Sequence, residues 1–155
     1  MPLIVRDPFR PQGYGTTVDA FSENIDIFPT IMEAVGLTPP AHLDGRSLLP
    51  ALESRPEPHE AVFWEDDFRE VAMGAAQAAL DLPLDACNMA VVRTARWKYV
   101  HFAALPPLLF DLDNDPAELV NLADDHAHAA IRIEMAERLL AWRAEHLDWR
   151  SPASN

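Results

Sequence analysis

The chain has 155 residues, of which 49% are hydrophobic and 24% are charged, proportions that fit a folded globular protein and exclude an intrinsically disordered one. Its formal net charge is −13, so nucleic acids and anionic membrane surfaces, which would repel it, are excluded as partners. The single cysteine, Cys87, excludes an internal disulfide and fits a reducing compartment, and no run of about 20 apolar residues is present to span a membrane. We therefore expect a cytoplasmic protein.

The first quarter of the chain predicts one helix after short strands and an irregular segment. Residues 3–5 form an apolar run between two prolines, which is typical of a buried strand, and residues 17–21 alternate weakly, as a second strand would. A helix is predicted within residues 22–37, because apolar residues recur there at helical spacing and Gly36 stands where helices commonly end. The residues that share its apolar face are Ile27, Phe28, Ile31, Ala34 and Val35.

The middle of the chain is less regular. Residues 38–60 are rich in proline and turn residues and predict one short helix, from Ser47 to Leu52. Residues 61–66 predict a strand. Residues 68–87 are rich in alanine and prone to form helix, but they are weakly patterned and leave their structure open.

Three further strands and a long helix are predicted in the last part. Residues 89–94, 97–102 and 108–112 are dominated by β-branched and aromatic residues, and three consecutive short strands imply a small antiparallel sheet with a face to cover. The covering element is a helix at about residues 127–147, with Glu134 and Arg138 forming an i,i+4 pair on its far side. Its apolar face is formed by Ile131, Met135, Leu139 and Trp142.

Six acidic residues between Leu108 and Asp125 raise the question of a calcium loop. Asp111, Asp113 and Asp115 occupy alternate positions, as the first ligands of such a loop do. The sixth position, which requires glycine for a sharp turn, is proline, and the twelfth, which requires a bidentate carboxylate, is leucine. A calcium site is therefore disfavoured.

A structural role is favoured for this acidic segment. Asp115 is predicted to be the N-cap of a short helix with Pro116 in its first turn, and Glu118 stands three residues later, as in a capping box. The apolar residues that follow are expected to dock on the sheet; they are Leu119, Val120 and Leu122.

Other reactive side chains are sparse. Cys87 has no nucleophile elbow around it and is interpreted as a small buried apolar residue. His126 and His128 stand two residues apart, which places them on different sides of a helix, so a solvated helix start capped by Asp124 or Asp125 is favoured over a metal site. The remaining isolated histidines are His42, His59, His101 and His146.

Residues 63–70 (FWEDDFRE) are the most site-like segment, because acidic residues, Arg69 and aromatic residues cluster there after a strand. A polar loop whose aromatic side chains pack inward is favoured over a substrate contact, which stays open as an alternative. No segment forms a catalytic constellation by its spacing. We therefore assign no catalytic, cofactor-binding or metal-binding residue to this chain.

Four segments nevertheless occur in a recognisable order: PLIVRDP, IDIFPTIMEAVGLTPPAHLDGRSLLPAL, AVVRTARWKYVHF and LLFDLDNDPAELVNLA. In this order they resemble the C-terminal part of sulfatase-family enzymes in the alkaline phosphatase superfamily. The resemblance is greatest to the phosphonate monoester hydrolase and arylsulfatase-like branch, and it covers about residues 2–147. Several motifs in the right order make the match strong, although each alone would be weak.

The resemblance implies a fold and a chemistry for the longer enzymes. The expected fold class is α/β, as an α+β fragment: one strand of the family's central sheet with a helix, then a small antiparallel C-terminal sheet covered by a long C-terminal helix. The implied activity is hydrolysis of sulfate, phosphate or phosphonate esters. The family attacks with the hydrate of a formylglycine, made from Cys or Ser in a C/S-x-P-x-R motif, and uses a divalent metal such as Mn, Ca or Zn.

This chain departs from the family's pattern at the residues that carry the chemistry. The sequence around Cys87 is CNMAV, and residues 54–58 (SRPEP) end in proline where the motif requires arginine. The family's metal-binding Asp-His pair precedes the segment that here begins the chain. We therefore expect no cofactor in this chain, and we expect it to be a fragment that is inactive by itself.

Two roles follow from these expectations. The first is the non-catalytic C-terminal portion of a hydrolase, with residues 1–55 ending the α/β core, residues 56–148 forming a C-terminal subdomain and residues 149–155 a tail. Its expected partner is the missing catalytic core. The alternative is a stand-alone interaction or oligomerisation module derived from that family, which forms a homo-oligomer.

Overall fold

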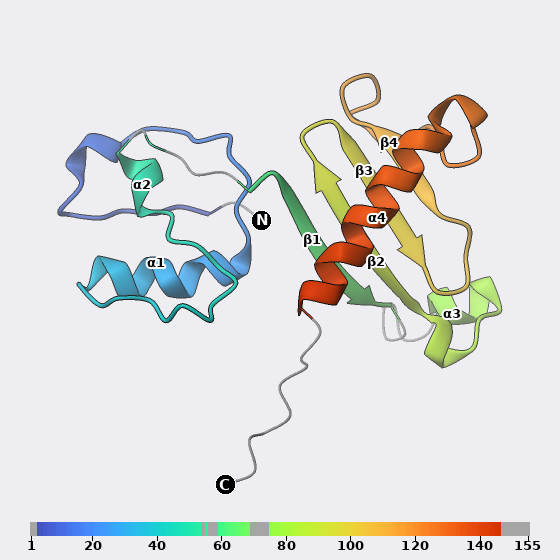
Figure 1. Ribbon diagram of the computed structural model, residues 1–155, viewed down its shortest axis with the longest axis horizontal. Helices are drawn as coiled ribbons and strands as arrows, with labels where there is room; N and C mark the ends of the chain where they lie inside the picture. The colour runs from blue at the N-terminus through green and yellow to red at the C-terminus, as the bar shows by residue number, and fades with distance from the viewer. Residues whose placement is uncertain (1–2, 54, 56–58, 69–74, 147–155) are drawn as a thin grey trace, which may run out of the picture. The chain divides into compact units, whose positions relative to one another are not determined.

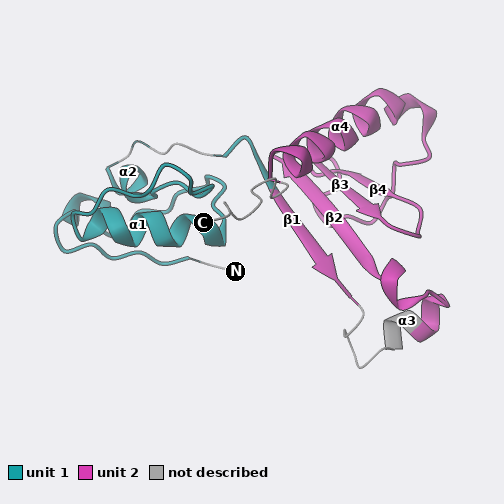
Figure 2. Cartoon of the chain, turned by 60° about the horizontal axis from the view of Figure 1, so that its bottom comes forward, with its two compact units in different colours: residues 1–62 teal, residues 63–155 magenta. Residues whose placement is uncertain are grey.

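The computed structural model describes residues 3–53, 55, 59–68 and 75–146, and it divides the chain into two compact units. Unit 1 comprises residues 1–62 and unit 2 comprises residues 63–155 (Figure 2). The domain boundary that we expected after residue 55 stays a prediction. None of the helices in the described ranges is long and apolar enough to cross a bilayer.

The described part of unit 1 contains two α-helices. A 3₁₀ turn, Asn24–Asp26, leads directly into α1 (Ile27–Ala34), and α2 (Leu49–Leu52) follows after a loop (Figure 1). Both helices confirm the predictions, although α2 begins two residues later than expected. Residues 17–21 form no strand, which corrects that prediction, and the apolar run at residues 3–5 is not part of the described sheet.

A network of buried polar groups holds α1 in unit 1. The carboxylate of Asp26 is fully buried and accepts hydrogen bonds from the backbone N–H groups of Glu23 (2.7 Å) and Arg46 (2.8 Å). One helical turn later, the hydroxyl of Thr30 accepts a hydrogen bond from the backbone N–H of Leu48 (2.9 Å). Because buried polar groups must be hydrogen-bonded, these two side chains fix the loop before α2 against the helix.

Gly45 allows that loop to approach so closely. A Cβ atom at this position would lie 2.1 Å from the carbonyl oxygen of Ile25 and 2.5 Å from its carbonyl carbon. Both atoms belong to the backbone and cannot rotate away. The Asp-Gly-Arg sequence at residues 44–46 therefore permits the contact that the Asp26 and Thr30 hydrogen bonds stabilise.

Unit 2 is built on a four-stranded antiparallel sheet in the order β1-β2-β3-β4 (Figure 1). The strands are β1 (Ala61–Asp67), β2 (Asn88–Thr94), β3 (Trp97–Phe102) and β4 (Leu108–Asp111). A tight hairpin joins β2 to β3, with Val91 opposite Val100, and Tyr99 pairs with Leu109 of β4. The strands that we predicted are confirmed, and β1 extends the three-stranded sheet to four. The ambiguous segment contains a short helix, α3 (Ala75–Leu80).

The long helix α4 (Ala129–His146) lies across one face of this sheet (Figure 1). Met135 and Leu139 on its predicted apolar face are buried, and Val92, Tyr99 and Leu109 of the sheet are buried as well. The predicted i,i+4 pair is also present, with 3.3 Å between the Arg138 guanidinium and the Glu134 carboxylate. The mixed α/β architecture with a small antiparallel sheet and a covering C-terminal helix is thus confirmed. This core sets the positions of the candidate site residues in unit 2.

Candidate functional site

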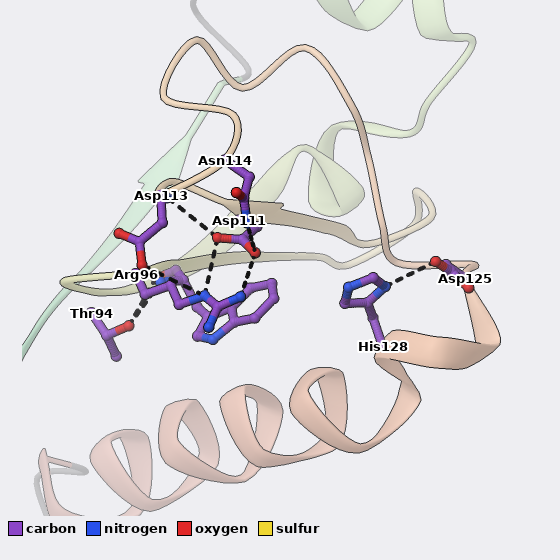
Figure 3. A network of polar contacts seen from close by, with 8 residues as sticks. Thr94, Arg96, Asp111, Asp113, Asn114, Asp125 and His128 are labelled. Carbon is purple, nitrogen blue, oxygen red and sulfur yellow. Dashed lines mark hydrogen bonds and ion pairs between the residues drawn. The ribbon is translucent and has the colours of Figure 1, made fainter.

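The acidic segment after β3 forms a closed polar network around Asp111 (Figure 3). Arg96, in the β2–β3 hairpin, donates two hydrogen bonds to the two oxygens of the Asp111 carboxylate, from Nε (3.1 Å) and from a terminal nitrogen (2.8 Å). The side chain of Asn114 (2.9 Å) and the backbone N–H of Asp113 (3.2 Å) donate to the same carboxylate. The paired guanidinium holds the pKa of the Asp111 carboxyl well below its usual range.

This network argues against a cation site at Asp111. The carboxylate is almost fully buried and both of its oxygens already accept hydrogen bonds from protein donors. A metal ion would have to displace the Arg96 guanidinium, itself a cation. The structural role that we favoured is therefore the one that the geometry supports, although its details differ.

The capping-box helix that we predicted after Asp115 is wrong. The Asp115 carboxylate accepts a hydrogen bond from the backbone N–H of Val120 (2.8 Å), five residues on. Glu118 has a backbone φ of +57°, in the left-handed region that ends a helix, and its carboxylate pairs with Lys98 of β3 at 2.5 Å instead of turning back to the cap. Leu119 and Val120 are exposed and do not dock on the sheet as expected, whereas the backbone N–H of Leu122 donates to the carbonyl oxygen of Leu109 in β4 (2.8 Å). A turn held by side chains replaces the helix.

His128, before α4, also has structural partners. Asp125 caps the start of this segment, as predicted, by accepting a hydrogen bond from the backbone N–H of Ala127 (2.9 Å). Its second oxygen lies 2.9 Å from Nδ1 of His128 (Figure 3), and the Ala127 and His128 hydrogen bonds lower the pKa of the Asp125 carboxyl. The His128 ring meets the Trp97 ring edge-on at 5.8 Å. The side chains therefore attach the start of α4 to β3.

The site-like segment at residues 63–70 lies mostly in β1, and Arg69 lies outside the described residues. The Phe63 ring stacks on Trp142 of α4 with ring centres 5.1 Å apart, and Glu65 pairs with Arg143 of α4 at 2.8 Å. Phe63 therefore packs inward, as we interpreted, whereas Trp64 next to it keeps 37% of its surface exposed.

A hollow of about 560 Å³ lies beside this strand. Three consecutive acidic residues of β1, at positions 65–67, line it together with Arg143 and His101. Within this lining, the guanidinium of Arg143 pairs with Glu65.

The remaining reactive side chains are also used within the fold. Cys87 is fully buried with its thiol 3.5 Å from the carbonyl oxygen of Pro83, which confirms the prediction of a small buried residue. His59, which stood isolated in the sequence, lies with Nε2 at 3.0 Å and 3.1 Å from the two carboxylate oxygens of Asp26. Sequence reasoning missed this pair. The i,i+4 spacing of Asp26 and Thr30 beside the apolar residues of α1 was the signal that could have revealed a polar network there.

The described residues do not fit the divalent metal that the resemblance implies. They include no group of three or more His, Cys, Asp and Glu side chains that could hold a metal ion. No buried side-chain nitrogen or oxygen in this part of the chain lacks a hydrogen-bond partner, so none of these atoms is left over to bind a metal ion. We therefore derive no catalytic step through a metal held by these residues.

Comparisons with known proteins agree with the motif order. The family model described as N-sulphoglucosamine sulphohydrolase, C-terminal, matches residues 1–145. The multifunctional alkaline phosphatase superfamily protein PehA of Trinickia caryophylli is 43% identical over 150 residues, which cover 96% of this chain and 29% of that protein. The choline-sulfatase of Rhizobium meliloti (strain 1021) is 33% identical over 130 residues, which cover 81% of this chain and 22% of that protein.

Solved structures give the same result. The phosphonate monoester hydrolase of Agrobacterium radiobacter superposes with a TM-score of 0.78 at 52% identity, over 92% of this chain and 29% of that one. The phosphonate monoester hydrolase SpPMH of Silicibacter pomeroyi superposes with a TM-score of 0.73 at 34% identity, over 85% and 27%. The chain thus spans less than a third of the length of these relatives. It belongs to the family of sulfatase C-terminal domains, within the sulfatase and phosphonate monoester hydrolase group of the alkaline phosphatase superfamily.

Proposed function

We propose that this chain is the non-catalytic C-terminal portion of a metal-dependent hydrolase of sulfate, phosphate or phosphonate esters. One observation carries the proposal: the side chains of this chain that could take part in chemistry make structural contacts instead. Asp111 is saturated by Arg96 and Asn114, and Cys87 is buried against a carbonyl oxygen. These groups support the fold and leave no assembled nucleophile or metal site among the described residues.

The chemistry is then supplied by the part of the longer enzyme that the relatives possess and this chain does not span. There, a divalent metal such as Mn, Ca or Zn would polarise the ester, and the hydrate of a formylglycine would attack it. The contribution of this chain is to stabilise that part and to shape its surroundings. The names of the relatives support an ester hydrolase as the parent activity.

An activity assay of the purified chain tests the proposal. Aryl phosphate, aryl phosphonate and aryl sulfate esters are incubated with the chain and Mn²⁺, and no turnover above the protein-free rate is expected. The control is a variant that lacks Cys87 and every histidine, because turnover that survives these changes identifies a contaminating hydrolase. Turnover that disappears in the Cys87→Ala variant while the chain remains folded would contradict the proposal.

A second candidate role, a stand-alone interaction or oligomerisation module, is favoured by one observation. Unit 1 exposes several large apolar side chains, among them Phe9 and Val35. A self-associating module would bury them against a second copy. In light scattering of the chain alone, an oligomerisation module gives a defined oligomer and an adapted interaction module gives a clean monomer, whereas aggregation indicates a fragment.

A further inference from the structure

The strand β4 lies at one edge of the described sheet, and half of its backbone groups point away from β3 (Figure 1). The backbone N–H of Leu112 donates to the carbonyl oxygen of Arg96 (2.7 Å). These two residues stand one step beyond the pair of Trp97 and Asp111. Residues of an antiparallel strand alternate between facing the partner strand and facing away from it. Leu109 and Asp111 therefore direct their backbone N–H and C=O groups toward the outer edge.

One side chain binds the backbone groups in the middle of this edge. The carboxamide oxygen of Asn121 accepts a hydrogen bond from the backbone N–H of Leu109 (2.9 Å), and its nitrogen donates to the carbonyl oxygen of Pro107 (3.3 Å). The next residue, Leu122, donates its backbone N–H to the carbonyl oxygen of Leu109 (2.8 Å). Asn121 and Leu122 thus make the contacts with Leu109 that a neighbouring strand would make.

The segment between β4 and Asn121 covers the far end of the edge as well. The outward carbonyl oxygen of Asp111 accepts hydrogen bonds from the backbone N–H groups of Asn114 (3.2 Å) and Asp115 (2.7 Å). The ion pair of Glu118 with β3 fastens the same segment to the sheet. The outer edge of β4 is therefore occupied by the stretch of chain that immediately follows the strand.

An uncovered edge at this place would invite another strand. Leu108, Leu109 and Phe110 are consecutive, apolar and uncharged, and unpaired edges of this kind readily add a strand. The same edge of a second copy is a suitable partner, because a two-fold axis makes two identical edges complementary. We propose that residues 112–122 form a strap that prevents β4 from pairing with β4 of a second copy, and that the Asn121 carboxamide is the lock of this strap. The proposal concerns unit 2 alone and does not depend on the ester hydrolase activity.

Hydrogen exchange of the Leu109 amide, measured by NMR on the 155-residue chain over a dilution series, tests the proposal. In the unmodified chain this amide should be protected to the same degree at every concentration. In Asn121→Ala it should exchange at least about tenfold faster in dilute samples, because its acceptor is removed. As the concentration rises, it should become protected again, and light scattering should show a larger apparent mass than that of the unmodified chain.

Two variants serve as matched controls. Asn114→Ala is the same substitution in the same strap, but the side chain that it removes binds the carboxylate of Asp111 and not the backbone of the edge. Asn121→Asp keeps an oxygen that can accept the hydrogen bond from Leu109. Both variants should change the Leu109 exchange rate by less than about threefold and leave the apparent mass unchanged.

The proposal would be overturned by a Leu109 amide that is unprotected in the unmodified chain, or by protection that rises with its concentration. Equal acceleration of exchange in Asn121→Ala and Asn114→Ala would also overturn it, as would faster exchange in Asn121→Ala without association at any concentration. Protection of the β2 and β3 amides reports whether unit 2 of each variant remains folded. Unfolding of Asn121→Ala alone would contradict the proposal too, because it would make Asn121 a requirement of the fold and not a lock on its edge.

Discussion

The close approach at Gly45 gives the sharpest prediction for the stability of unit 1. In the Gly45→Ala variant, the new Cβ atom would lie 2.1 Å from the carbonyl oxygen of Ile25, far inside a normal contact. Relief requires the loop to move away from the start of α1. That movement lengthens the 2.8 Å hydrogen bond from the Arg46 N–H to Asp26 and the 2.9 Å bond from the Leu48 N–H to Thr30.

Two costs add in this variant. Overpacking a close contact costs about 1–3 kcal/mol, and weakening the hydrogen bonding of a buried acceptor costs about 1–3 kcal/mol. We expect a loss of about 3 kcal/mol in the free energy of unfolding of unit 1. That value corresponds to an increase of about a hundredfold in the population of the unfolded unit.

Amide hydrogen exchange of residues 26–48 measures this change, since the four tryptophans of the chain lie at positions 64, 97, 142 and 149 and report on unit 2. The matched control is Gly15→Ala, where φ is +74° but no atom lies within 4 Å of the added Cβ. Backbone strain alone costs about 1 kcal/mol, so exchange should accelerate only about fivefold there. Equal acceleration in the two variants would refute the role assigned to Gly45.

Three further predictions concern unit 2. Met135→Ala, at a fully buried position under the sheet, should lower the free energy of unfolding by about 3 kcal/mol in urea titrations followed by tryptophan fluorescence, while Ile133→Ala on the exposed side should change it by less than about 1 kcal/mol. The folded-state pKa of Asp111 is depressed, so the stability that its carboxylate contributes is present above the ordinary carboxyl pKa of about 4 and is lost as the pH falls toward the folded value. Asp111→Asn should therefore be less stable than the unmodified chain at pH 7 and lose less stability below pH 4. Parallel pH profiles of the free energy of unfolding in the two proteins would contradict the Arg96 network. The buried thiol of Cys87 should react with Ellman's reagent only as fast as unit 2 opens, so rapid labelling of the folded chain would show that the thiol is accessible.

The elements that follow from local pattern were predictable. Alternating β-branched and aromatic residues predicted β2 and β3, and the spacing of Met135 and Leu139 predicted the buried face of α4. Both patterns indicate which side of an element is buried. Asp125 was also predictable as a cap, because its partner, the backbone N–H of Ala127, is only two residues away in the sequence.

Features set by distant partners were not predictable in this way. Local rules favoured a capping box for Glu118, but its carboxylate is taken by Lys98, 20 residues earlier in the chain and brought near by the sheet. His59 meets Asp26 across 33 residues. For Glu118 a tertiary contact overrides a local preference. In both cases the partner is distant, and a single sequence contains no direct record of which distant pair will meet.

The apolar pattern of α1 shows a different limit. The spacing of Ile27, Ile31 and Val35 indicated one shared face, and the structure keeps that face together, but exposed. Periodicity identifies a surface that must be covered without identifying what covers it. The buried Asp26 and Thr30 settle the direction, because their hydrogen-bond partners lie on the other side of the helix.

We propose that this chain shapes a hydrolase without supplying a reacting group. Kinetics of a chimera, in which this chain replaces the matched segment of PehA within one polypeptide, test this proposal most directly. The measurement is kcat/KM for an aryl ester in the chimera and in its Cys87→Ser and His101→Gln variants, with thermal midpoints measured in parallel. We expect the chimera to hydrolyse the ester and each variant to change kcat/KM by less than about threefold. A loss of about a hundredfold or more in either variant, with an unchanged thermal midpoint, would show that this chain takes part in the chemistry and would contradict the account.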